Sequence, residues 1–308
     1  MDKMLHLSVS PHTHCGRTTS SIMLDVIISL LPAAIAGVVI FGLNALLVVA
    51  VCVAACVGFE YLFNLIAKKE QTIGDYSAIV TGLLLGLTLP ATTPIWQCII
   101  GALFAIVVVK CLFGGLGYNF VNPAITARVF MRVSFPIVAV AAFPVGVDAT
   151  AGATPLAQLA NGESVDLLTL LLGNHGGSVG ETCAIALILG FLYLLARDVI
   201  SWEIPVSFIG SVFVFSFLME GDAMKALAAI LSGGLLLGAI FMATDYVTSP
   251  TTPAGKLIFG VGCGLITFLI RYFGDYSEGA AFAILIMNIL VPYIDKLTKH
   301  KVYGGKKA

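Results

Sequence analysis

The amino-acid sequence predicts an all-α integral membrane protein with about ten transmembrane helices, arranged as two inverted repeats of five helices each. The 308-residue chain is 59% hydrophobic and only 11% charged, with a mean hydropathy of +1.02, whereas soluble domains carry about 25% charged residues. Apolar runs of bilayer-spanning length follow one another along most of the chain. A series of motifs from the first half also recurs in the second half.

Ten apolar segments account for the predicted helices. The third ends in a Pro/Thr run at 90–94, and the eighth ends in another at 244–253. Backbone groups freed by such breaks must be buried in protein or face a watery cavity. We therefore expect the two breaks to face each other and to line an ion or electron path. The segments run over residues 22–43, 45–67, 76–91, 95–113, 121–143, 182–197, 199–219, 226–244, 256–273 and 279–297.

The internal repeat consists of matched motifs in the same order. Each half contains Gly-Leu-Leu-Leu-Gly, then Thr-Thr-Pro, then a basic residue shortly before Phe-Gly. Because five helices is an odd number, the second half must enter the membrane from the opposite side, which is the inverted-repeat plan of transporters. The matched positions are 82–86 and 234–238, 92–94 and 251–253, and Lys110 and Arg271.

Lysine and arginine are distributed asymmetrically about these segments. If the N-terminus is cytoplasmic, nearly all of them fall on the cytoplasmic side, whereas the loop 144–181 contains none. The positive-inside rule then predicts a cell (inner) membrane protein with both termini in the cytoplasm and this loop outside. The predicted organisation is an N-terminal segment (1–21), a first repeat (22–143), the extracytoplasmic loop (144–181), a second repeat (182–297) and a basic tail (298–308).

The extracytoplasmic loop contains a small, polar stretch at 148–156 in otherwise apolar surroundings. Thr154 follows Gly152 and Ala153, which let another protein's backbone approach closely. Pro155 biases Thr154 towards an extended conformation. A threonine hydroxyl displayed in this way, with the carboxylate of Asp148 upstream, is suited to covalent modification. The residues alone favour the other interpretation, a Gly/Ala linker that joins the two halves.

Two arginines lie within the fifth apolar segment. Arg128 and Arg132 are four residues apart and share one helical face. Arginine at membrane depth is costly and usually faces the bundle interior. We consider two roles: a clamp on an anionic group, such as a flavin phosphate or a partner carboxylate, or structural pairing while the side chains snorkel from the cytoplasmic end.

Two carboxylates are candidates for an ion pathway, because ionisable residues inside the membrane commonly mark one. Glu60 lies in the second segment, and Asp245 lies at the break of the eighth, where Thr244 and Thr248 supply hydroxyl oxygens suited to a hard cation such as sodium. The alternative for Asp245 is hydrogen-bond satisfaction at a broken helix. Asp75 is predicted to cap the third helix.

Several classes of function are excluded or disfavoured. A net charge of -1 gives no general attraction to nucleic acid. The sequence has no Walker A loop, dinucleotide fingerprint or nucleophile elbow, so no catalytic residue is expected. None of the seven cysteines forms a CxxC pair or an iron–sulfur run, and no metal site is expected. His12 and His14 are predicted to be solvated or to dock a partner.

Several blocks along nearly the full chain resemble one family of membrane proteins. It comprises the D subunit of the Rnf complex, a membrane-bound ferredoxin:NAD oxidoreductase, and the B subunit of the sodium-pumping NADH:quinone reductase. The latter has a longer N-terminal region, so the resemblance favours the Rnf protein. The matching blocks are Ser10-Pro11-His12, 75–85, 110–124, 152–156, 241–250, Glu278-Gly279 and 288–292.

The resemblance implies a fold, a cofactor and a role. The family core is similar to that of urea transporters, and its motif threonine carries FMN through a phosphoester bond; Thr154 is the matching position. The motif's Ser or Thr three residues earlier is Ala151 here, and Asp148 matches an acidic residue that a flavin transferase recognises.

The implied role is electron transfer between ferredoxin and NAD, coupled to sodium or proton transport within a multi-subunit complex in the lipid membrane. A second, non-covalent flavin such as riboflavin between the repeats is an open alternative. A solute channel or transporter without a redox role is the other interpretation of the inverted repeat.

Overall fold

The computed structural model describes residues 16–145, 154–161, 165–274 and 278–299. Within these ranges every regular element is helical, apart from one isolated antiparallel bridge between Ala142 and Gly177. In these described ranges, five helices are long and apolar enough to cross a membrane, so the chain is a multi-pass membrane protein. They are α1 (Thr19–Phe41), α2 (Leu43–Ile66), α9 (Glu203–Glu220), α12 (Pro253–Phe273) and α13 (Ala280–Thr298).

The remaining predicted segments form shorter or broken helices in the described part of the chain. A sixth span results if α10 and the helical segment Leu235–Met242, which meet at a bend of 65°, are taken as one. The others are shorter than the roughly 20 residues that cross a bilayer unaided. The shorter elements are α3 (Ser77–Thr88), α4 (Ile95–Leu103) continued by η2 (Phe104–Cys111), α5 (Pro123–Ser134), α8 (Ala184–Ala196), α10 (Ala223–Leu231), α11 (Leu235–Leu237) and η4 (Gly238–Met242).

Local sequence explains where these helices begin and end. Asn122 caps α5 by accepting from the backbone N–H groups of residues 124 and 125, and Thr252 caps α12 in the same way through Gly255. Proline occupies the first position of both helices, where its missing N–H costs nothing. The predicted fifth segment, 121–143, is α-helical only to Ser134, because Pro136 restricts the preceding residue and cannot donate to the helix; a short 3-10 turn, η3 (Pro136–Ala139), follows.

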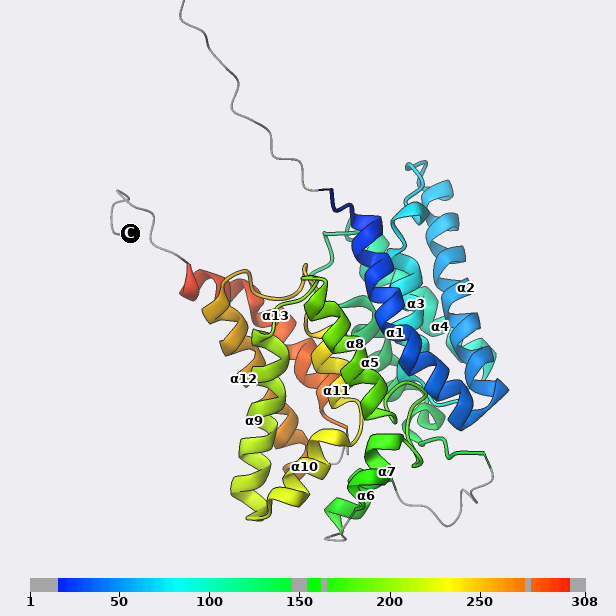
Figure 1. Ribbon diagram of the computed structural model, residues 1–308. Coiled ribbons are helices and arrows are strands. Elements are labelled where there is room, and N and C mark those ends of the chain that lie inside the picture. Colours follow the sequence, from blue (N-terminus) through cyan, green and yellow to red (C-terminus); the bar gives the residue numbers. More distant parts are fainter. Residues whose placement is uncertain (1–15, 146–153, 162–164, 275–277, 300–308) are drawn as a thin grey trace, which may run out of the picture.

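The helices form two groups that meet along the middle of the molecule (Figure 1). Helices α1 to α4 make one group, α9, α12 and α13 make the other, and α5, α8 and α11 lie between them. The beginning of α1 and the end of α13 lie at one end of the bundle. The short helices α6 (Pro155–Ala160) and α7 (Leu167–Leu172) lie at the opposite end. Thr154 therefore lies at the end away from the described termini.

Both Gly-Leu-Leu-Leu-Gly motifs contribute to one buried core. Leu83 and Leu84 of α3 and the three leucines of α11 belong to the same cluster of buried apolar side chains. Small residues allow close helix approach elsewhere: a side chain at Gly260 or Gly264 of α12 would collide with Ser207 or Ser211 of α9. Such small-residue contacts let backbones pack tightly where lipid offers no hydrophobic driving force.

The prediction that the two Pro/Thr breaks face each other was wrong. Pro90, just after α3, lines a cavity that also contains Thr154, whereas Thr244 and Asp245 line a different cavity beside Lys110. The helices that precede the breaks pack through the same core. However, the direction in which each helix crosses the bundle sets the end at which its Pro/Thr run lies. A sequence motif does not specify that direction.

Candidate functional site

Thr154 lines a cavity between the short helix α6 and the helical bundle. It is the N-cap of α6, and its Oγ1 accepts a hydrogen bond of 3.3 Å from the backbone N–H of Ala157. The side chain is partly exposed, and it lines the cavity together with Arg128 and Arg132. The other predicted motif residues, Asp148, Gly152 and Ala153, lie outside the described residues.

The two arginines converge on one carboxylate. Arg128 Nη2 and Arg132 Nη1 donate to Glu278 Oε2 at 3.1 Å and 2.8 Å, and Arg128 also contacts Ser178 Oγ at 3.4 Å. Their side chains are only 4% and 8% exposed, and both line the cavity that contains Thr154, so the two guanidinium groups are paired inside the protein. The two guanidinium groups and the Glu278 carboxylate thus form one cluster of paired charges at the cavity.

Glu181 is a second carboxylate in the same cavity. Its side chain is buried, and its Oε2 has no hydrogen-bond partner within the described part of the chain. Its Oε1 lies against Gly234, where a β-carbon would come within 2.6 Å. Burial, together with the charge of Glu278, raises the pKa of Glu181 to about 8. Burial acts to raise the pKa of Glu278 too, but Arg128 and Arg132 hold it below its ordinary value.

The two carboxylates are therefore in different states at neutral pH. Glu278 is ionised between two guanidinium groups, and Glu181 is protonated. With Arg271 nearby, three cations face one carboxylate anion. The cavity thus carries net positive charge and favours an anionic group.

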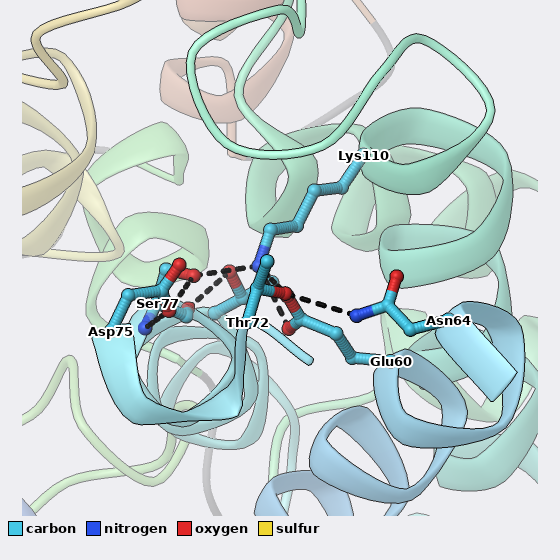
Figure 2. A network of polar contacts seen from close by, with 7 residues as sticks. Glu60, Asn64, Thr72, Asp75, Ser77 and Lys110 are labelled. Carbon is cyan, nitrogen blue, oxygen red and sulfur yellow. Dashed lines mark hydrogen bonds and ion pairs between the residues drawn. The ribbon is translucent and has the colours of Figure 1, made fainter. Parts of the chain in front are cut away.

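A separate polar network lies near the opposite end of the first helix group (Figure 2). Lys110 Nζ donates to both carboxylate oxygens of Glu60, at 2.9 Å and 2.8 Å, and to Ser77 Oγ at 2.6 Å. Both ionic side chains are 3% exposed. Thr72 donates to Glu60 at 2.7 Å, and Asn64 donates to Thr72. Glu60, one of the two carboxylates considered for an ion pathway, therefore has partners on both of its oxygens.

Ser77 connects this network to the start of α3. Asp75 accepts from the backbone N–H and the hydroxyl of Ser77, at 2.8 Å and 2.6 Å. The carboxylate thus satisfies the first N–H of the helix, as predicted for Asp75, although the N-cap position itself is Tyr76 in a left-handed conformation. Ser77 and Lys110 also line the cavity that contains Asp245.

Asp245 lies in the turn after η4 and has one of its two predicted neighbours as a partner. Thr248 Oγ1 donates to Asp245 Oδ2 at 2.9 Å. Thr244 instead donates back to the carbonyl of Ile240 at 2.6 Å, although it lines the same cavity. The turn therefore satisfies the carboxylate locally, through Thr248 and the backbone of the residues that follow Asp245.

Nearly the whole chain matches one protein family. The match to the NQR2, RnfD, RnfE family extends over residues 6–304. The chain belongs to this family. It is 45% identical to the D subunit of the Na(+)-translocating ferredoxin:NAD(+) oxidoreductase complex of Acetobacterium woodii, over 98% of this chain and 96% of that protein.

Two further relatives are named for complexes that transport protons or an unspecified ion. The chain is 39% identical to the D subunit of the proton-translocating ferredoxin:NAD(+) oxidoreductase complex of Clostridium ljungdahlii, over 98% of this chain and 96% of that protein. It is 34% identical to the D subunit of the ion-translocating oxidoreductase complex of Aeromonas salmonicida, over 99% of this chain and 100% of that protein. These relatives are subunits of ion-translocating oxidoreductase complexes.

The ionisable residues Arg128, Arg132 and Glu60 were recognised from the sequence, but the residues that pair with them were not. Glu278 and Glu181 lie far from Arg128 along the chain, and no local pattern joins them. For Glu60 a signal existed: Lys110 also lies at the end of an apolar segment, and a charge buried in a membrane protein needs an opposite charge. This pair was therefore within reach of the sequence.

Proposed function

We propose that this chain is the membrane electron-transfer subunit of an Rnf-type complex and carries FMN covalently on Thr154. The complex would couple electron transfer between ferredoxin and NAD to the transport of sodium or protons. The observation that carries the proposal is the position of Thr154: in a chain of this family, its hydroxyl lines a cavity with two buried arginines. FMN would supply reversible electron storage there.

The residues of the cavity fit a flavin phosphate. Arg128 and Arg132 provide guanidinium donors, which match phosphate oxygens in geometry and charge. The net positive charge of the cavity suits the single negative charge of a phosphodiester. Thr154 caps a helix of six residues, so its hydroxyl is held at the cavity by the local fold. This fit supports the attachment site on physical grounds.

The proposal also implies partners. A separate transferase must attach the flavin, because a threonine hydroxyl is a poor nucleophile. Other subunits of the complex would deliver and accept the electrons, and membrane lipid would cover the apolar outer helix faces. Large apolar side chains on those faces are widely exposed, as in Val39 (77%), Ile66 (80%) and Leu218 (74%).

The inverted repeat and the orientation are part of the same proposal. The two halves would each contribute five membrane elements, in a core like that of urea transporters. Lys110 and Arg271, the matched basic residues of the two halves, make similar contacts. Lys110 donates to Ser77, and Arg271 donates to the carbonyl of Ala229 at 2.6 Å. Ser77 and Ala229 each lie five residues before the Gly-Leu-Leu-Leu-Gly motif. Both termini would be cytoplasmic, with Thr154 outside.

The cavity beside Asp245 is the proposed place for a second flavin or for the transported ion. Apolar walls from Val80, Leu84 and Phe241 are combined with polar groups from Asn119, Asn122 and Lys110. Cavities of this kind, apolar with a few convergent polar groups, are typical of cofactor sites. Thr244, Asp245 and Thr248 remain ion-pathway candidates at its edge, and Glu60 remains one through its contact with Lys110.

We expect Asp245→Asn to lower ion transport several-fold in vesicles containing the whole complex, and to lower ferredoxin-to-NAD electron transfer much less. The substitution keeps the shape and the bond from Thr248 but removes the charge that an ion or proton would neutralise. Asp198→Asn is the matched control, because this carboxylate is 88% exposed. Equal ion transport in both variants would show that Asp245 is only a hydrogen-bond acceptor.

A solute channel without a redox role is the competing function, and one measurement separates the two. The chain is denatured, separated on a gel and examined for flavin fluorescence, which only a covalent flavin survives. Fluorescence of this band supports the electron-transfer role. A dark band from cells that contain an active flavin transferase would contradict the proposal.

A further inference from the structure

The cavity beside Thr154 contains an ionisable group that the attachment of a flavin does not require. Glu181 lies among charged residues from several elements: Glu278 before α13, Arg128 and Arg132 on α5, and Arg271 on α12. The loop that carries Glu181 also contributes His175.

Glu181 is the carboxylate of this group that combines three structural features. Its Oε2 is buried and lacks a hydrogen-bond partner in the part of the chain that the structure describes, whereas Glu278 is held by two arginines. It lines the same cavity as Thr154. Together with Arg128 and Glu278 it also lines a smaller cavity that reaches inwards to Thr88 and Met242. Glu181 thus stands at the boundary between the loop side and the protein interior.

A buried carboxylate with one unpartnered oxygen is costly when ionised, because desolvation of the charge is only partly compensated, here by the Ser178 hydroxyl and the nearby arginines. Its proton is therefore sensitive to any new charge in the cavity. A negative charge added nearby disfavours ionisation further, whereas its removal allows the proton to leave. Neither Glu278, which is fixed by two guanidinium groups, nor the arginines can respond in this way.

We propose that Glu181 is the proton-exchanging residue of this site: it binds one proton when a negative charge arrives on the flavin at Thr154, and releases it when that charge leaves. This inference rests on the proposed function. One electron from the complex's upstream carrier adds one negative charge, and the Glu181 carboxylate takes one proton from water to form the neutral acid. Transfer of the electron to the next carrier reverses the step.

The protonation state of Glu181 before the flavin is reduced decides how the reduction potential depends on pH. Below a pH of about 8 Glu181 is already protonated, so reduction binds no proton there through this residue. Above it, reduction converts the carboxylate into the acid, and the reduction potential therefore falls more steeply as the pH rises. Burial lowers the pKa of His175, so this residue is neutral throughout the same range. Its protonation does not contribute to the change in slope.

The experiment is a redox titration of the flavin absorbance in the full-length chain, purified in detergent, at a series of pH values on both sides of 8. The unsubstituted protein should show a steeper fall of potential above this pH. Glu181→Gln should remove the change of slope and give a higher potential than the unsubstituted protein at high pH only. Asp166→Asn, an exposed carboxylate on the same connecting segment, should behave as the unsubstituted protein.

The outcomes separate this inference from the proposed function. A chain without bound flavin would contradict the function itself. A flavin-loaded Glu181→Gln variant with an unchanged slope would contradict only the role of Glu181. Infrared difference spectra of the unsubstituted protein above pH 8 give a test without mutation. A carboxylic acid C=O band should grow on reduction, and the lack of such a band would overturn the inference.

Discussion

Replacing Thr154 by alanine is expected to abolish the flavin fluorescence of the denatured chain, because the substitution removes the only oxygen through which the proposed phosphoester forms at this position. The fold should persist. Loss of the hydrogen bond from Ala157 to the Thr154 hydroxyl removes one N-cap, which costs about 1 kcal/mol. The measurement is in-gel fluorescence of equal amounts of chain, together with the elution profile in detergent.

Two control variants make this result specific. Thr150→Ala changes the nearest other threonine in the motif and should leave the band fluorescent. Thr169→Ala removes a hydroxyl that bonds Asp166 on the same connecting segment and should also leave it fluorescent. A fluorescent Thr154→Ala band, with fluorescence lost in Thr150→Ala instead, would move the attachment site and contradict the role of the cavity.

Removing the charge of Lys110 is expected to have the largest effect on stability. Lys110→Met leaves Glu60 buried without its cation, and breaking a buried ion pair in this way costs about 3–5 kcal/mol. Thermal unfolding of the detergent-solubilised chain should therefore shift to much lower temperature. The double variant Glu60→Leu/Lys110→Met should recover most of the loss, because an apolar pair of similar volume avoids the desolvation of both charges.

An exposed ion pair in the same protein provides the control. Arg17 and Asp198 lie 4.0 Å apart, with side chains 47% and 88% exposed. Arg17→Gln should change stability by less than about 1 kcal/mol, as exposed ion pairs usually do. If Lys110→Met were as stable as Arg17→Gln, the pair with Glu60 would not hold α2 and η2 together, and its burial would need another explanation.

The sequence predicted the elements that short-range physics controls. Hydropathy located each apolar segment because burial in lipid depends on composition over a short window. Proline and its capping neighbour located the starts of α5 and α12, because a missing donor and a side-chain acceptor act within one helical turn. The resemblance to the family was also readable, since motifs such as 110–124 and 241–250 are continuous in the chain.

Helix lengths and directions were harder to predict from the sequence. The segment 121–143 is apolar throughout, but α5 ends at Ser134, and the eighth segment bends by 65° between α10 and the segment Leu235–Met242. Hydropathy averages over such breaks and so does not place them. The error about the Pro/Thr breaks has the same origin, because the destination of a helix end depends on how that helix crosses its neighbours.

The sequence by itself determined that this chain is a helical membrane protein of a known family, and it singled out Thr154, Arg128, Arg132 and Asp245. Only the tertiary structure decided what these residues contact. In the folded chain, Thr154 lines one cavity with the two arginines, and both arginines form ion pairs with Glu278. Glu60 forms an ion pair with Lys110, which lies fifty positions away in the sequence. Charges at membrane depth must find partners wherever the fold brings them, and those partners are fixed by helix packing across the whole bundle and not by spacing along the chain.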